Sequence, residues 1–303
     1  MRILFIFLDG VGLGDDDPLT NPFAKADLPT LHELLGSRLI RQNNPLHRKA
    51  ASLIPLDACL GVSGLPQSAT GQAALLTGKN IPALLGTHYG PKPNPAISAH
   101  LAEDNLFSRI KAGGRTTALL NAFPQRYFDG LDSGKHLPGA IAMAARFAGL
   151  ELRNPVDLHS RNALSADFTG TGWRDSLGYQ NAPIYTPRQA GQKLSELAIT
   201  LNLALFEYWV SDYIGHKQDM VKAIQILQQL DEVIAGLIST WNTQDDLILI
   251  TSDHGNLEDI STRRHTFNPV PAILLGSEAS RRKFAHNLVD IAGITPAILS
   301  MFS

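Results

Sequence analysis

Short apolar runs alternate with longer helical patterns along most of the 303-residue chain. Turn residues bound each apolar run, and the segments between the runs carry apolar residues at helical spacing. This alternation is typical of a largely parallel sheet with helices on both faces, so we predict a three-layer α/β/α sandwich. We expect the strands at Ile3 to Leu8, Thr116 to Leu120, Leu203 to Val210, Leu247 to Thr251 and Val270 to Leu275.

Helices are expected between these strands. The one that begins at Pro187 has a clear start signal, because Thr186 can cap it and proline at the first helical position loses no hydrogen bond. The other predicted helices are Pro29 to Leu35, Gly71 to Leu76, Asn105 to Ala112, Met220 to Trp241 and Arg282 to Ala292, and the Pro187 helix should end at Ile199.

One segment does not follow this rhythm. Residues 123–185 are rich in glycine, asparagine, aspartate and aromatic residues, with a single predicted helix at Pro138 to Gly149. We therefore expect a core formed by residues 1–122 and 186–303, with residues 123–185 inserted as a small cap or lid.

Composition excludes several classes of protein. The formal net charge of −2 gives no reason to expect a nucleic acid or an anionic membrane as partner. A single cysteine, Cys59, excludes an internal disulfide and a thiolate metal cluster. No apolar run approaches the ~20 residues of a membrane span. We expect a soluble, cytoplasmic protein; its oligomeric state is not predicted.

The first apolar run ends in an acid, Asp9, within the stretch FLDGVGLGDDD. Its glycines read G-x-G-x-G, whereas a dinucleotide-binding turn needs the third glycine one position later, and the acids that follow would repel a pyrophosphate. Asp9 by itself is read as a turn former or helix cap. It becomes a candidate ligand if similar residues recur at other strand ends.

Such residues do recur. Asp212 and His216 follow the predicted strand at Leu203, in a short loop, and the dipeptide Asp253-His254 follows the strand at Leu247. His265 precedes the last strand. Carboxylate and imidazole ligands without thiolate suit Zn²⁺ or Mn²⁺, and six such residues exceed one tetrahedral zinc site, so we predict two divalent ions.

Ser68 lies just before the predicted helix at Gly71, in the stretch LPQSATGQAALLTG. One interpretation is an ordinary serine cap. The other is a hydroxyl among free backbone N–H groups at the positive end of a helix, where a phosphate can bind. Beside two metal ions this hydroxyl would be a nucleophile.

Five motifs, in order, resemble those of the alkaline phosphatase superfamily, and most of all its cofactor-independent phosphoglycerate mutases and phosphopentomutases. Those enzymes open with an apolar strand ending in Asp-Gly and carry Ser/Thr-x-x-Gly-His, Asp-x-x-Gly-His, Ala-Asp-His-Gly-Asn and a final histidine before Asn-Pro-Val-Pro. The resemblance covers residues 1 to about 121 and about 187 to 303. The matching stretches here are FLDGVG, SATGQ, DYIGH, SDHGN and HTFNPVP.

The resemblance implies an alkaline phosphatase-like fold and a role for each motif residue. One metal ion would be bound by Asp212, His216 and His265. The other would be bound by Asp9, Asp253 and His254, with Ser68 as ligand and nucleophile that forms a phosphoserine.

Two departures from the family pattern bear on the reaction. Gln72 stands where the mutases have histidine, and the insertion is small for a mutase cap, so we predict a phosphatase or phosphodiesterase that acts on a small phosphorylated substrate. A phosphomutase and a non-catalytic metal-binding protein of the same fold remain as alternatives. Candidate substrate contacts are Gln72 and Arg264; Lys79, Arg126 and Arg263 are further basic residues near the predicted site segments.

Overall fold

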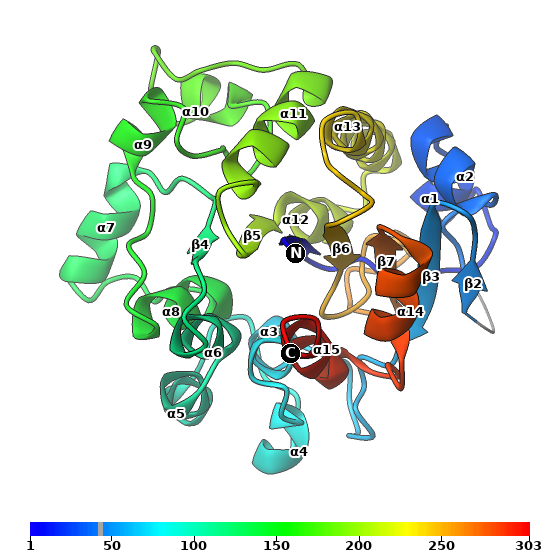
Figure 1. The fold of residues 1–303 in the computed structure, drawn as a ribbon, viewed down its shortest axis with the longest axis horizontal. Coiled ribbons are helices and arrows are strands. Elements are labelled where there is room, and N and C mark those ends of the chain that lie inside the picture. The colour runs from blue at the N-terminus through cyan, green and yellow to red at the C-terminus, as the bar shows by residue number, and fades with distance from the viewer. Residues whose placement is uncertain (42–44) are drawn as a thin grey trace.

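The computed structural model describes residues 1–41 and 45–303. Seven strands form one sheet in the order β2-β3-β7-β6-β1-β5-β4. Helices cover both faces of this sheet (Figure 1). The strands are β1 (Ile3–Leu8), β2 (Leu46–His47), β3 (Ala51–Leu56), β4 (Thr117–Leu119), β5 (Leu203–Tyr208), β6 (Leu247–Thr251) and β7 (Val270–Leu275).

Helices lie between most of the strands, as predicted. They are α1 (Pro22–Lys25), α2 (Pro29–Leu35), α3 (Ser68–Thr77), α4 (Ile81–Leu85), α5 (Pro95–Glu103), α6 (Leu106–Ala112), α7 (Gln125–Asp132), α8 (Ala140–Phe147), α9 (Pro155–His159), α10 (Thr171–Asp175), α11 (Pro187–Ala198), α12 (Val210–Gly215), α13 (Met220–Ile238), α14 (Glu278–Ala285) and α15 (Ile294–Ser300), with a 3-10 turn η1 (Ile291–Gly293) before the last. Of these, α1, α4, α5, α7, α9, α10 and α15 were not predicted.

The sheet has a parallel half and an antiparallel half. β1 lies between β5 and β6 and is parallel to both, and β4 is parallel to β5. β7 is antiparallel to β6 and to β3. The predicted α/β fold with a mostly parallel sheet is confirmed: β3 again runs in the direction of β1, and β7 and the short β2 run opposite to the other strands.

Successive side chains of β1 point alternately to the two faces of the sheet, and each face is covered by apolar side chains. All six residues of β1 are buried, as expected of a strand covered on both sides. Phe5 belongs to the apolar layer on one face, with residues of α3, α5, α6 and α8, whereas Ile6 belongs to the layer on the other, with residues of α1, α2, α11 and α13. The core therefore consists of two layers of apolar side chains.

Residues 123–185 divide between the main core and a cluster of their own. Helix α8 lies in the layer that covers the sheet beside α3 and α5. Trp173 packs in a small separate cluster with Leu158 and Ala163, and its ring centroid lies 4.8 Å from that of Tyr179. Phe168 instead stacks on Phe206 of the sheet, with the ring centroids 4.9 Å apart.

Several details of the structure differ from the sequence prediction. β3 was not predicted; Pro55, its fifth residue, lies opposite Pro271 of β7. The DYIGH stretch forms helix α12 rather than a loop. The C-terminal helix predicted at Arg282 begins earlier, at Glu278, because Ser277 caps it, and it ends at Ala285.

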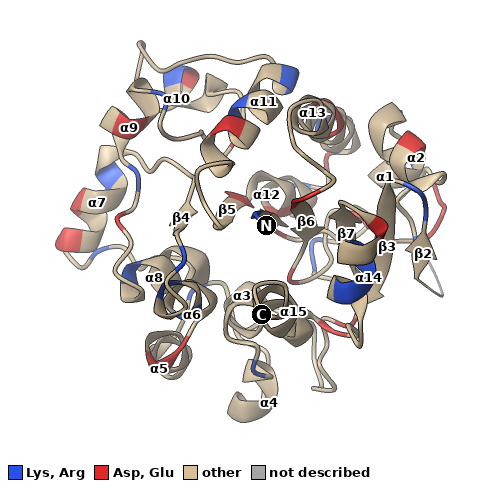
Figure 2. Cartoon of the chain, viewed as in Figure 1, with Lys and Arg blue, Asp and Glu red and all other residues tan. Residues whose placement is uncertain are grey.

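Charged residues of both signs occur on the outer helices, for example on α7 and α11 (Figure 2). No helix among residues 1–41 and 45–303 is long and apolar enough to cross a membrane.

Candidate metal centre

The candidate ligands meet at one edge of the sheet because of the strand directions. β1, β5 and β6 are parallel, so the residues that follow them emerge at the same edge. These are Asp9 after β1, helix α12 after β5, and Asp253 and His254 after β6. His265 precedes β7, and it reaches this edge because β7 runs antiparallel to β6.

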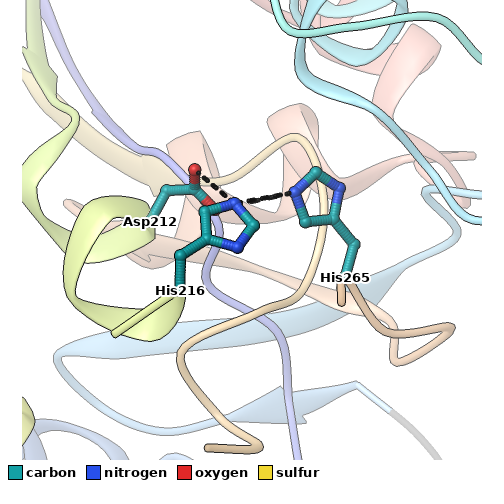
Figure 3. A group of neighbouring side chains, drawn as sticks. All are labelled: Asp212, His216 and His265. Atoms are coloured by element: carbon teal, nitrogen blue, oxygen red, sulfur yellow. Dashed lines mark hydrogen bonds and ion pairs between the residues drawn. The ribbon is translucent and has the colours of Figure 1, made fainter. Parts of the chain in front are cut away.

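One group of candidate ligands comprises Asp212, His216 and His265 (Figure 3). Nε2 of His216 lies 3.3 Å from an Asp212 oxygen and 3.4 Å from Nε2 of His265. Helix α12 explains the first distance, because residues four apart lie on the same helical face. One ligand atom from each of the three residues lies within 4.8 Å of the other two.

The second group lies beside it and shares Asp212. Ligand atoms of Asp9, Asp212 and His254 also lie within 4.8 Å of one another. Nε2 of His254 is 3.4 Å from Oδ1 of Asp9 and 3.6 Å from Oδ2 of Asp253. Asp212 therefore lies between the two groups, whereas the family pattern assigns it to only one.

The histidine rings are oriented by backbone carbonyls. Nδ1 of His265 lies 2.7 Å from the Pro66 carbonyl oxygen, and Nδ1 of His216 lies 2.8 Å from that of Arg263. Because a carbonyl only accepts, each Nδ1 carries a proton and donates, so Nε2 has a free lone pair whenever the ring is neutral. Nε2 is the atom that faces the aspartates, and this arrangement is common around metal-binding histidines.

The carboxylates show why a cation fits here. Among the described residues, Oδ1 of Asp9 and Oδ2 of Asp253 are buried without a hydrogen-bond partner. Burial raises the pKa of Asp9 well above its usual range, and Asp253 adds to the shift. Burial also raises the pKa of Asp253 to about 7. Unpartnered buried carboxylate oxygens are costly, and a divalent cation would compensate them.

The two groups differ in their protonation. Burial opposes ionisation of Asp212, but its hydrogen bond with His216 and the nearby His254 outweigh burial and lower the pKa of Asp212 to about 2. The same hydrogen bond raises the pKa of His216. Burial lowers the pKa of His254 and of His265, which favours the neutral imidazole that binds metal.

Ser68 is the first residue of α3 rather than a residue before it, with Gln67 at the N-cap position. Its hydroxyl oxygen lies 3.0 Å from Nε2 of His254, so Ser68 reaches the second group. Helix α3 is ten residues long and buried throughout, which holds the serine rigidly at its positive end.

A cavity of about 670 Å³ opens onto this centre. Ser68 lines it, and so does Gln72, one turn further along α3. The cavity lining also includes Asp9, Asp212, His216, Lys92, Arg126, Glu207, Trp209 and Tyr213.

The basic residues singled out from the sequence do not all reach the cavity. Arg126 lines it, whereas Lys79 pairs with Glu103 at 2.8 Å. Arg264 is exposed in the loop beside His265 and is not part of the lining, so its role as a substrate contact stays a prediction.

Sequence reasoning missed Glu258, which ties the ligand loops together. This carboxylate is 1 % exposed and accepts hydrogen bonds from the backbone N–H groups of Gly12 and Asn256, both at 2.8 Å, and from the Thr266 hydroxyl. It thereby joins the segments that carry Asp9, His254 and His265. The position of Glu258, five residues after Asp253, does not reveal this role in the sequence. Its hydrogen-bond partners come from three segments that meet only in the folded chain.

Gly10 is required by close packing at the same centre. Its φ of +66° is in the left-handed region, and a Cβ at this position would lie 2.5 Å from Oδ1 of Asp212. Only glycine lets the loop after β1 approach Asp212 this closely. The Asp-Gly pair in the opening motif therefore has a steric reason as well as a chemical one.

Part of the chain matches known proteins. Residues 188–303 match the family model described as "Metalloenzyme superfamily". A 2,3-bisphosphoglycerate-independent phosphoglycerate mutase of Antithamnion sp. is 29 % identical over 125 residues, and one of Yersinia pestis is 28 % identical over 128. Each alignment covers 38 % of this chain but only 24 % of the relative, so the chain matches about a quarter of the length of these mutases.

Solved structures share the fold over nearly the whole chain. The alkaline phosphatase from the Antarctic bacterium TAB5 superposes with a TM-score of 0.54 at 12 % identity, covering 99 % of this chain and 97 % of that one. The C-terminal periplasmic domain of EcEptC from Escherichia coli, solved in complex with Zn, gives 0.51 at 13 % identity, covering 97 % and 80 %.

The fold is an alkaline phosphatase-like α/β architecture, and the ligand arrangement makes a candidate metal centre. The matches confirm the resemblance predicted from the five motifs. The C-terminal part of this chain is similar to metalloenzymes, among them the phosphoglycerate mutases.

Proposed function

We propose that this protein hydrolyses phosphoric esters at a centre of two divalent metal ions, through a phosphoserine at Ser68. The observation that carries the proposal is the Ser68 hydroxyl, which opens into the cavity and lies 3.0 Å from Nε2 of His254. A nucleophile within reach of a ligand cluster, at the N-terminus of a helix, is the arrangement that phosphoryl transfer needs.

The two ions would be held by the residues that the family pattern assigns. Asp212, His216 and His265 would hold one, and Asp9, Asp253, His254 and Ser68 would hold the other. Nitrogen and oxygen ligands without sulfur suit Mn²⁺ or Zn²⁺. When bound, such ions would favour the ionised form of the serine hydroxyl and offset charge on the transferred phosphoryl group.

The chain's own residues would carry out the transfer in two steps. Oγ of Ser68 loses its proton and attacks phosphorus while the bond from phosphorus to the ester oxygen breaks, and the leaving oxygen takes up one proton to give the alcohol. Backbone N–H groups at the start of α3 and the Gln72 amide donate hydrogen bonds to the phosphoryl oxygens. Water then attacks the phosphoserine, which releases phosphate and restores the hydroxyl.

Hydrolysis is favoured over a mutase reaction by two features. Gln72 supplies a neutral amide where the mutases carry histidine, so it cannot deliver a proton to a returning substrate. Residues 123–185, which we propose as the cap, also form a short segment for retaining a substrate while it reorients. A phosphomutase is the second candidate, and the similarity to phosphoglycerate mutases supports it.

The proposal is tested by turnover of p-nitrophenyl phosphate and bis-p-nitrophenyl phosphate. Protein stripped of metal and reloaded with Mn²⁺ or Zn²⁺ should cleave at least one of them, and Ser68→Ala should abolish this activity. Ser239→Ala, which changes an exposed serine at the end of α13, is the matched control. Stoichiometric metal binding without turnover of either compound would contradict a general esterase. Conversion of a phosphopentose or phosphoglycerate isomer would then indicate the mutase.

A further inference from the structure

Helix α12 presents more than metal-ligand residues to the cavity. Trp209, Asp212, Tyr213 and His216 are spaced as positions i, i+3, i+4 and i+7, the spacing of one helical face. All four residues line the cavity. The face that carries Asp212 and His216 therefore continues directly into two aromatic rings.

These two aromatic side chains are unusually open to solvent. Trp209 is 49 % exposed and Tyr213 is 53 % exposed. The other two tryptophans of the chain, Trp173 and Trp241, are only 4 % and 5 % exposed. Leaving an indole half in water forfeits much of its burial energy, and an exposed aromatic pair beside a binding cavity is a feature of recognition rather than of folding.

The two rings are about equally exposed and differ in their neighbours. The Tyr213 ring already has a partner, because Nζ of Lys217 lies 5.2 Å from its centroid. The Trp209 and Tyr213 rings meet edge to face, with centroids 6.4 Å apart and planes at 83°. An edge-to-face contact between two rings leaves at least one face of the Trp209 indole ring uncovered by Tyr213.

The cavity is larger than a phosphoryl group requires. Its volume of about 670 Å³ falls in the range that holds a drug-sized ligand. Phe123, Tyr127 and Leu177 line it together with Trp209. An apolar, ring-lined space of this size beside the nucleophile matches a bulky alcohol and not a small, wholly polar one.

We propose that the alcohol of the substrate carries a flat aromatic ring and that Trp209 is the surface on which this ring stacks. The inference rests on the proposed function, because it assigns the substrate class of the same site. With the phosphoryl group at Ser68, the ring would lie against the α12 face beside the ligands. Stacking of a base on an aromatic side chain changes affinity by about tenfold to a hundredfold.

The test compares adenosine 5′-monophosphate with ribose 5-phosphate. Both carry the phosphoryl group on the same primary hydroxyl of ribose, so they differ in the aromatic base. Binding is measured by calorimetry to metal-loaded Ser68→Ala protein, and kcat/KM is measured for the wild-type enzyme. We expect the adenosine compound to bind at least about tenfold more tightly. In a protein that also carries Trp209→Ala, this ratio should fall toward one, whereas Trp209→Phe should keep most of it.

Phe147→Ala is the control, because it removes an exposed aromatic ring of α8 that lies outside the cavity lining, and it should leave the ratio unchanged. A ratio close to one in the parent protein, or a ratio that survives Trp209→Ala, overturns the inference. The two proposals fail separately. Equal cleavage of both compounds would keep phosphoryl transfer and remove the ring site, whereas selective binding without turnover would keep the ring site and remove ester hydrolysis.

Discussion

The side-chain oxygen of Ser68 lies 3.0 Å from Nε2 of His254, although 186 residues separate them in the chain. The contact joins the start of helix α3 to the loop that follows β6. Ser68, the first residue of α3, therefore contacts His254 directly. Burial lowers the pKa of His254, which favours its neutral ring.

A phosphorylated intermediate should form on Ser68. Acid quenching during turnover of p-nitrophenyl phosphate should trap the mass of one phosphoryl group on the peptide that contains this residue, since phosphoserine is stable in acid. Mass spectrometry of the digested protein is the measurement. Ser68→Ala should carry no such label, and a label on another residue, or none during active turnover, would contradict the proposed nucleophile.

Changing one ligand group should remove one ion. His216→Ala deletes a ligand of the group with Asp212 and His265, so bound metal after dialysis should fall from about two equivalents to about one. Elemental analysis gives the count. His286→Ala, at an exposed position on the C-terminal side of α14, should leave two equivalents. Unchanged stoichiometry in His216→Ala would argue against this assignment.

Metal-free protein should lose stability as pH rises. The folded-state pKa of Asp253 is about 7, above the ~3.9 of an unfolded aspartate, so the folded state holds the extra proton between these values. The associated stability is fully present below about pH 4 and is lost as pH rises through 7. Urea unfolding with a chelator should therefore give a lower free energy at pH 8 than at pH 5.

Asp253→Asn should flatten this pH dependence, because its side chain does not titrate. Asp245→Asn, which changes an exposed aspartate before β6, should not flatten it. Adding Mn²⁺ or Zn²⁺ should reverse the trend in the parent protein, since ionised carboxylates bind metal more tightly. A metal-free protein that gains stability between pH 5 and pH 8 would show that the carboxylates are not coupled as described.

Glu258→Ala should be strongly destabilising. The change leaves the N–H groups of Gly12 and Asn256 and the side-chain donors of Thr266 and Asn268 without their acceptor. Loss of buried partners of this kind costs about 3–5 kcal/mol of unfolding free energy. Chemical denaturation monitored by circular dichroism is the measurement.

The matched control is Glu278→Ala, which removes an exposed glutamate that pairs with Arg282 on the same helix. This change should cost less than about 1 kcal/mol, because surface ion pairs contribute little. Glu258→Gln should lie between the two, since its amide oxygen can still accept some of the hydrogen bonds. A loss in Glu258→Ala no larger than in the control would mean that the ligand loops do not depend on this carboxylate.

Much of the fold follows from local sequence patterns. β1, β6 and β7 have the bounds predicted for them, because each is a buried apolar run that ends in turn residues. The Pro187 helix begins where predicted, since Thr186 caps it. β3 could not be predicted this way: its proline is tolerated only because of where it pairs with β7.

The sequence by itself determined which residue types follow which strands, and so the identity of the candidate ligands. Only the tertiary structure decided how they are grouped. Antiparallel β7 brings His265 to the edge where Asp212 lies, and helix α12 turns His216 toward that same carboxylate. Pattern and capping act within a few residues, whereas a shared ligand depends on contacts between segments far apart in the chain, and these form only when the sheet assembles.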